Sequence, residues 1–343
     1  MEGVRIIQAG ILATIQDLGR RGYQKYGMPV SGAMDSFALQ VGNILVGNER
    51  GEAAIEITYP GFEAEFLTDC VFAVTGGDLG AKLDGRYISM WKSYRAQKGS
   101  RLIFTELRAG CRSYLAVNGG IDVPIVMGSK STYLRGKIGG FEGRKLQAGD
   151  ILHLASDRTG WDELVGRRMP VSCIPSYPSG CEILVILGPQ HEAFTKESLE
   201  KFLGTPYRIG KESDRMGYRL EGERLEHLEG PDIISDGIAL GAIQVPGHGM
   251  PIVMLADRQT TGGYTKIATV ITVDIPKLAQ MKPGDEISFS VISLKEAHRL
   301  LREQEALLQR LKDWPPSPAS REYRMKIDGI SYDICVEDWV DFK

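Results

Sequence analysis

The stretch PIVMLADRQTTGGYTKIATV, from Pro251 to Val270, contains an apolar segment, a polar turn and a β-branched segment within twenty residues. Val, Ile and Thr favour strands, and the Gly262-Gly263 pair lets the backbone bend without a Cβ clash. The turn carries both charge signs, an amide, hydroxyls and a phenol, on Asp257, Arg258, Gln259, Thr260, Thr261, Tyr264 and Lys266. One interpretation is a hairpin with a solvated loop, although hairpin loops are usually shorter and rich in Asn, Gly and Asp. The other is a surface for a ligand or partner.

Short β-branched segments recur on both sides of this run and are separated by glycine, which makes up 41 of the 343 residues. Because helical segments do not alternate with them, the pattern favours antiparallel sheets or barrels over a doubly wound nucleotide-binding fold. The predicted strands are Val71 to Thr75, Arg101 to Leu107, Ser113 to Val117, Glu182 to Leu187, Ala242 to Val245, Pro251 to Ala256, Ile267 to Ile275 and Glu286 to Ile292.

Three helices are predicted from apolar positions at helical spacing. Ser36 to Val46 has Asp35 placed to cap its start and Gly47 to end it, and a second helix runs from His191 to Leu203. The third begins at the capping-box spacing of Ser293 and Glu296. Its leucine stripe ends before Trp314 and a Pro-rich segment, so we expect it to pack on a domain edge.

Two echoes within the chain favour a duplicated β domain. Pro124-Ile-Val-Met127 repeats as Pro251-Ile-Val-Met254, and Ala-Gly-Asp150 and Pro-Gly-Asp285 each precede a short apolar segment. We predict one domain over residues 1–165, a second over 170–292, a terminal helix over 293–314 and a tail over 315–343. In the tail, the alternation from Tyr323 to Val336 predicts a hairpin around Asp328-Gly329, which needs something to dock on.

Bulk properties exclude several classes of protein. The net charge of -3 gives no electrostatic case for binding nucleic acid, and the longest apolar runs are far too short for a membrane span. The start of the chain lacks a signal-peptide pattern, so a cytoplasmic protein is expected. Five scattered cysteines without a CxxC pair indicate neither a disulfide framework nor a metal site.

Several polar clusters contain Arg or Asp beside Gly or Ser, a combination suited to binding carboxylate or phosphate groups. The candidates outside the opening run are Arg20, Asp35, Arg144, Asp214 and Arg215. Structural interpretations stand beside each: Asp35 as a helix cap, Arg144 in an ion pair, Asp214 in a turn. Because no P-loop, dinucleotide-binding, nucleophile-elbow or HExxH motif is present, a self-sufficient hydrolase or ATPase is hard to build, which points to a partner protein.

Six motifs together resemble the KipA family, also called allophanate hydrolase subunit 2, which includes one of the subunits of bacterial 5-oxoprolinase. They run in order from about residue 5 to 292: TIQDLGR (14–20), SGAMD (31–35), VTGG (74–77), YLAV (114–117) with Gly119-Gly120, SDRMGYRL (213–220) and DRQTTGGY (257–264). The resemblance implies two tandem cyclophilin-like β-barrels, in agreement with the mainly β, duplicated pattern.

The resemblance implies three functions. The first is the KipA-type subunit of a bacterial ATP-dependent 5-oxoprolinase, which opens 5-oxo-L-proline to L-glutamate together with a KipI-like subunit and a third subunit. The second is the carboxyltransferase part of a biotin-dependent urea or amide carboxylase. The third is a non-enzymatic antagonist of a KipI-type sporulation kinase inhibitor.

Both enzymatic functions need a pocket for a small amide or lactam, with donors for its carbonyl and a cation for developing charge. We predict Lys266, Tyr264 and Arg258 as catalytic, and as substrate-binding Asp214, Arg215, Gln259, Thr260, Thr261, Arg20, Asp35 and Arg144. No metal is expected. The complex would use ATP, and a biotin carrier enters only under the carboxylase function, for which the chain to Lys343 has no Met-Lys-Met motif.

Overall fold

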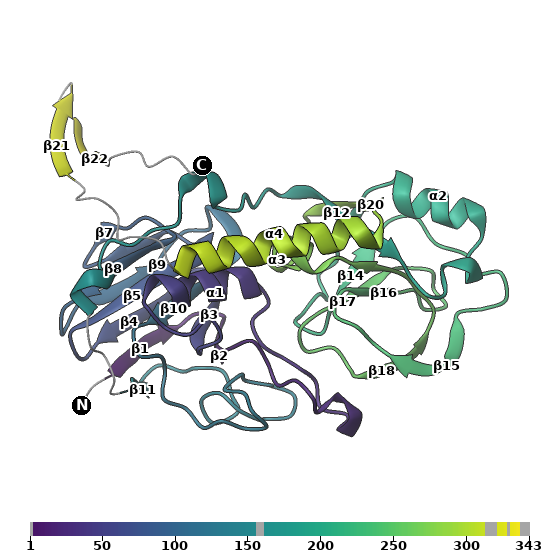
Figure 1. Ribbon diagram of the computed structural model, residues 1–343, viewed down its shortest axis with the longest axis horizontal. Helices are drawn as coiled ribbons and strands as arrows, with labels where there is room; N and C mark the ends of the chain where they lie inside the picture. The colour runs from purple at the N-terminus through teal and green to yellow at the C-terminus, as the bar shows by residue number, and fades with distance from the viewer. Residues whose placement is uncertain (1–2, 156–160, 313–320, 328–329, 337–343) are drawn as a thin grey trace.

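The N-terminal half of the chain surrounds a hydrophobic core with two sheets (Figure 1). The computed structural model describes residues 3–155, 161–312, 321–327 and 330–336. The first sheet has the order β11-β1-β4-β9-β6-β7, built from Ile151–His153, Gly3–Ala9, Phe62–Phe66, Arg101–Phe104, Ala81–Leu83 and Arg86–Tyr87. The second has the order β2-β3-β10-β5-β8, built from Leu12–Gln16, Ala54–Thr58, Ala109–Val117, Cys70–Asp78 and Lys92–Ala96.

Side-chain alternation explains how the two sheets differ. Along β4, Phe62, Ala64 and Phe66 are buried while the intervening glutamates are partly exposed, so only one face of this strand meets the core. In β5, residues 70–77 are all buried. Its second face is covered by helix α1 (Ser36–Leu45), which packs Phe37 and Val41 with Val71 and Ala73 of the strand. This helix places the SGAMD segment against the interior of the molecule.

The C-terminal half forms a closed seven-stranded barrel in the order β12-β19-β16-β17-β14-β13-β20. Its strands are Gly180–Leu187, Lys266–Val270, Ala242–Gln244, Ile252–Met254, Gly217–Glu221, Tyr207–Ile209 and Glu286–Val291. All neighbouring pairs are antiparallel except β12 and β20, whose parallel pairing closes the barrel. Beside the barrel, β15 (Asp232–Gly237) and β18 (Thr261–Tyr264) form a separate two-stranded ribbon. Helix α2 (Lys196–Gly204) and the short α3 (Ile275–Ala279) flank the barrel strands.

Helix α4 (Leu294–Lys312) joins the two halves, as Figure 1 shows. It starts directly after the last barrel strand, where Ser293 Oγ accepts a bond of 3.2 Å from Glu296 N. Farther along, Leu308 and Leu311 are buried in one cluster with Phe37 and other residues of α1. Burial of this leucine stripe therefore ties the end of the second half to the helix of the first.

The mainly β fold is confirmed, as are the caps at Asp35 and Ser293. The hairpin interpretation of the opening run is wrong, because β16 lies between β17 and β19 and pairs with both. The strand predicted to Ile275 ends at Val270, where a short 3-10 turn leads into α3. The helix predicted from His191 begins at Lys196 instead, since the Thr195 side chain caps it.

The two internal sequence repeats have matching structures only in part. Asp150 and Asp285 do precede closing strands, β11 and β20, whereas residues 124–127 form no strand and so do not match β17. In the tail, β21 (Arg321–Ile327) and β22 (Ile330–Val336) pair as the predicted hairpin, whose turn at Asp328-Gly329 lies outside the described residues. The predicted domain limits stay predictions. Within the described chain, every helix is too short or too polar to cross a bilayer.

We expect Leu308→Ala to lower the free energy of unfolding by about 2–5 kcal/mol, because it removes a fully buried side chain between α4 and α1. The control is Leu294→Ala, on the same helix but 57% exposed, which should change stability by less than about 0.5 kcal/mol. Urea unfolding measures both. Equal effects would show that α4 does not hold the halves together.

Candidate active site between the two halves

Arg215 of the second half bridges two buried carboxylates, one from each half. Its Nε and Nη2 bind the Asp257 carboxylate at 3.0 and 3.2 Å, and its Nη1 lies 2.5 Å from Glu56 Oε1 on β3. Nη2 also donates to the Gly32 carbonyl at 2.6 Å. Burial by itself would lower the Arg215 pKa, but Asp257 and Glu56 outweigh it and raise the pKa. Because the planar guanidinium group binds its acceptors in fixed directions, it fixes the position of one half relative to the other.

The second oxygen of Glu56 extends the network to the SGAMD segment. Glu56 Oε2 accepts bonds of 2.8 Å from Tyr114 Oη and from Met34 N, and Tyr114 Oη accepts one of 2.7 Å from Asp35 N. Glu56 is therefore paired with one cation and two donors, which is what a buried carboxylate requires.

Asp35 is both a helix cap and a contact between the halves. Its Oδ1 accepts from Ala38 N at 2.8 Å, while Oδ2 accepts from Gln280 Nε2 at 2.8 Å and from Tyr177 Oη at 3.0 Å. Complete burial raises the Asp35 pKa to about 6, although these hydrogen bonds act in the opposite direction. The side chain predicted to bind substrate is thus occupied by protein groups.

Gln280 and Arg112 form the neighbouring contact between the halves. Gln280 Oε1 accepts from the backbone N–H groups of Cys111 and Arg112 at 3.1 and 3.0 Å. The Arg112 Nη1 donates to Tyr218 Oη at 2.8 Å and to the Ala279 carbonyl. Its Nε is buried and has no hydrogen-bond partner among the described residues.

A cavity of about 390 Å³ lies beside these contacts and is lined from both halves. Its polar wall comprises Thr58, Tyr59, Arg112, Arg135, Lys211, Ser213, Asp214, Arg215, Tyr218 and Asp257, and its apolar wall Ile11, Leu12, Leu134, Met216, Met281 and Pro283. Thr58 Oγ1, like Arg112 Nε, is buried without a partner in the described structure. Unpaired buried polar groups are costly, so their presence in two residues that line this cavity makes it a candidate functional site.

The cavity offers the groups that a small anionic amide needs. Within the described chain neither Lys211 nor Arg135 takes part in an ion pair, so both cations are free to attract a carboxylate. The phenol of Tyr59 supplies a hydroxyl, and burial raises its pKa, which favours the protonated donor form. Tyr59 also has a φ of +66°, a strained conformation for a tyrosine. No group of three His, Cys, Asp or Glu residues suited to a metal ion occurs in the described regions.

The structure brings only some of the predicted site residues to this cavity. Asp214 and Arg215 line it, although Asp214 Oδ1 also accepts from Met216 N at 2.8 Å, as expected for a turn. Of the described residues lining the cavity, none is from the other nine predicted positions. Arg20 is fully buried, donates to the Ser131 carbonyl, and has Nε and Nη1 without partners in the described structure.

The polar residues of the opening run lie in several different environments. Asp257 joins the Arg215 bridge, and Arg258 Nε and Nη1 donate to the carbonyls of Ile238 and Leu255 at 3.0 and 3.2 Å. Burial and the nearby Arg21 lower the Arg258 pKa to about 10.

The rest of the run lies farther from the bridge in sequence. Gln259 is exposed and Thr260 is half-buried, while Thr261 and Tyr264 are the first and last residues of strand β18. Lys266 Nζ lies 2.9 Å from Asp236 Oδ2. The catalytic roles predicted for Lys266, Tyr264 and Arg258 stay predictions.

Arg144 lies in an ion pair, as its structural interpretation proposed. Its Nη1 and Nη2 contact the two oxygens of Asp150 at 2.7 and 2.9 Å, and Glu142 binds it as well. These bonds occupy the guanidinium group and fix the turn before β11.

Sequence reasoning missed Thr58, Tyr59, Arg112, Lys211 and the bridging Glu56. A signal existed for Glu56, since a lone glutamate within the apolar strand Ala54–Thr58 is a buried charge that needs a cation. Arg112 offers a similar signal at the centre of β10. Nothing local marks Thr58 or Tyr59, because their significance depends on the facing half.

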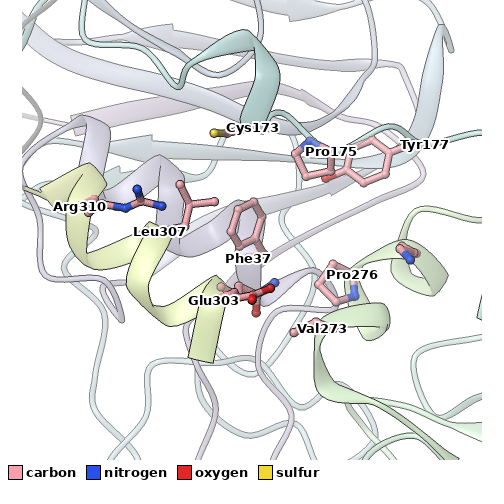
Figure 2. A pocket seen from close by; sticks show the side chains of 11 residues that line it. Phe37, Cys173, Pro175, Tyr177, Val273, Pro276, Glu303, Leu307 and Arg310 are labelled. Atoms are coloured by element: carbon pink, nitrogen blue, oxygen red, sulfur yellow. The ribbon is translucent and has the colours of Figure 1, made fainter. Parts of the chain in front are cut away.

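A second cavity, of about 340 Å³, lies beneath α4 and is shown in Figure 2. Phe37, Pro175, Tyr177, Val273 and Leu307 give it a mainly apolar wall. Its charged groups are engaged: Lys277 pairs with Asp274 at 2.7 Å, Glu303 pairs with Arg299, and Arg310 has a partner too. The first cavity is therefore the better candidate for a polar substrate.

Comparison with known proteins agrees with this architecture. The model of the family described as carboxyltransferase domain, subdomain A and B, matches residues 26–291. The chain belongs to this family. A 5-oxoprolinase subunit of Escherichia coli (strain K12) is 40% identical over 310 residues, covering 90% of this chain and 97% of that protein. The resemblance predicted from the motifs is confirmed.

Larger proteins contain a segment similar to this chain. The urea amidolyase of Saccharomyces cerevisiae (strain ATCC 204508 / S288c) is 35% identical over 323 residues, covering 90% of this chain and 18% of that protein. The crystal structure of the K. lactis urea amidolyase matches with a TM-score of 0.85 at 31% identity, covering 91% of this chain and 20% of that chain. The chain thus spans about a fifth of these multi-domain relatives.

Replacing Arg215 should destabilise this carboxyltransferase domain strongly. Arg215→Met leaves Glu56 and Asp257 buried without their cation, so we expect a loss of about 3–5 kcal/mol in urea unfolding. The control, Arg208→Met, breaks the exposed pair with Glu286 and should cost less than about 1 kcal/mol. Similar small losses in both variants would contradict the bridge.

The raised pKa of Asp35 predicts a specific dependence of stability on pH. Its pKa of about 6 in the folded state exceeds its ordinary value, so folding favours the protonated form, and this contribution is lost as pH rises through 6. Between pH 5 and pH 7, we expect the titration of Asp35 to lower the free energy of unfolding of the natural chain by about 1 kcal/mol. The Asp35→Asn variant should lack this decrease. Urea unfolding at both pH values measures this difference. Parallel pH profiles would contradict the raised pKa.

Proposed function

We propose that this chain is the KipA-type subunit of an ATP-dependent 5-oxoprolinase, which opens 5-oxo-L-proline to L-glutamate in the cytoplasm. The observation that carries the proposal is the cavity between the halves, with the unpartnered Arg112 Nε and Thr58 Oγ1 beside Lys211 and Arg135. 5-Oxoproline is a small lactam with one carboxylate, and it fits the volume, the positive charge and the free donors of this cavity.

The chemistry explains why ATP would be needed. A lactam carbonyl is a poor electrophile because the ring nitrogen shares its lone pair with it, and transfer of a phosphoryl group to the lactam oxygen makes the carbon reactive. One water is added across the ring C–N bond, and a second is consumed in converting ATP to ADP and phosphate. Arg112 and Thr58 would hold the substrate, and Tyr59 would supply a proton to the departing ring nitrogen.

The proposal includes two partners, a KipI-like subunit and a third subunit, without which this chain would be inactive. Its support is the name of the Escherichia coli relative, which describes one subunit of a 5-oxoprolinase, and the absence of a P-loop motif from the sequence. ATP would be a substrate of the assembled complex.

A second candidate function is carboxyl transfer to an amide nitrogen, with a biotinylated carrier as the carboxyl donor. The match to the K. lactis urea amidolyase favours it. The same cavity would bind urea or another amide. Here the reaction would depend on the carrier, and 5-oxoproline would produce no ADP.

The test is ADP release by the assembled complex with 5-oxoproline as substrate. We expect Thr58→Val, which removes the hydroxyl at nearly constant volume, to lower kcat/KM by about tenfold or more. Thr269→Val, in barrel strand β19 and away from the cavity lining, is the matched control and should leave kcat/KM unchanged. If ADP were released only with urea and a biotinylated carrier, the 5-oxoprolinase function would be rejected and the carboxyl-transfer function supported. Equal rates for both variants would contradict the cavity as the substrate site.

A further inference from the structure

The ribbon of β15 and β18 is the most exposed apolar feature of the second half. Five of the six residues of β15 are exposed, and Ile234 within it is 94% exposed. Tyr264 at the end of β18 is 42% exposed, and Leu228, shortly before β15, is 63% exposed. Figure 1 shows the ribbon along the lower edge of the barrel, below β16 and β17. Two large exposed apolar side chains, Ile234 and Tyr264, thus lie on one small ribbon, and Leu228 lies in the segment that leads to it, as an interaction surface would require.

The ribbon also has unpaired strand edges. β15 and β18 form a sheet of two strands, so each leaves one edge without a strand partner in the described chain. Their pairing is irregular between Asp232 and Asp236, the stretch that contains Ile234. An unpaired edge can accept an added strand, with backbone bonds for affinity and alternate side chains for specificity, and the irregularity and the acids of β15 restrict which strand fits.

The chain segment that leads into β15 and includes it is strongly acidic. Between residues 221 and 237 the exposed acids are Glu221, Glu223, Glu226, Glu229, Asp232 and Asp236, against Arg224 as the one Lys or Arg. Apart from Asp236, none of these acids forms an ion pair within the described chain. The charge therefore selects a partner with lysines or arginines beside its apolar residues.

The ribbon is held in place before any partner binds. Lys266 Nζ binds Asp236 at 2.9 Å, and the backbone bonds Thr265 N to Pro231 O (2.9 Å) and Ile238 N to Thr260 O (3.0 Å) fix its ends. A Cβ at Gly262 would lie 2.6 Å from Ile238 Cδ1, which shows how closely the ribbon packs on this side chain. A preformed edge costs little ordering entropy on binding.

We propose that the β15–β18 ribbon is the docking site for the KipI-like partner of the enzyme, which adds a basic, apolar strand to its edge. The proposal rests on the proposed function for the identity of the occupant. It assigns the Thr261-Gly-Gly-Tyr264 part of the opening run to the contact between the two proteins, while Asp257 of the same run supports the cavity between the halves.

The test is calorimetric binding of this chain to the purified KipI-like protein, with Ile234→Asp as the variant. We expect at least about tenfold weaker binding, because the change puts a charge into the apolar contact and adds to its acidity. Ile125→Asp is the control, since Ile125 is 68% exposed in the first half, and its affinity should match that of the natural chain. Circular dichroism confirms that both variants fold.

Three outcomes would overturn the docking site: unchanged affinity of Ile234→Asp, equal weakening by Ile125→Asp, or no binding by the natural chain. Self-association of this chain that Ile234→Asp abolishes would overturn it too, because the occupant would then be a second copy. Turnover of 5-oxoproline by the natural complex is measured separately. Binding that depends on Ile234 without such turnover supports the docking site and rejects the proposed function.

Discussion

The bridge from Arg215 to Glu56 and Asp257 is the interaction on which the arrangement of the two halves depends. A buried guanidinium must be paired, and here its two carboxylates come from different halves, so the ion pair with Glu56 forms only while the halves are together. Asp35, Gln280 and Tyr177 add hydrogen bonds around the same junction. The cavity lies beside these polar contacts, and its shape depends on the position that they fix for one half relative to the other.

Local signals predicted much of the fold. The cap residues Asp35 and Ser293 start helices as expected, because capping depends on residues a few positions apart. Strand pairing was harder, since the opening run reads as a hairpin although β16 lies between its two barrel strands. Which strands become neighbours is decided by the whole barrel, and a twenty-residue window contains no information on it.

The candidate site was predicted less well than the fold. The motifs pointed to Asp214 and Arg215, both at the cavity, and to Asp35, which caps a helix and contacts Gln280. Thr58 and Arg112 were missed because their lack of partners appears only when the halves are together. Lys266, predicted as catalytic, pairs with Asp236 beside the ribbon, a contact thirty positions away that the sequence does not indicate.

The Pro251–Val270 run thus contributes to two features of the chain, the cavity proposed to bind the substrate and the ribbon proposed to bind a partner protein. The most direct measurement is a structure of the assembled complex with 5-oxoproline bound. We predict the ligand in the cavity between the halves, within hydrogen-bond distance of Arg112 Nε and Thr58 Oγ1. A ligand bound elsewhere, with this cavity holding only water, would contradict the proposed substrate site.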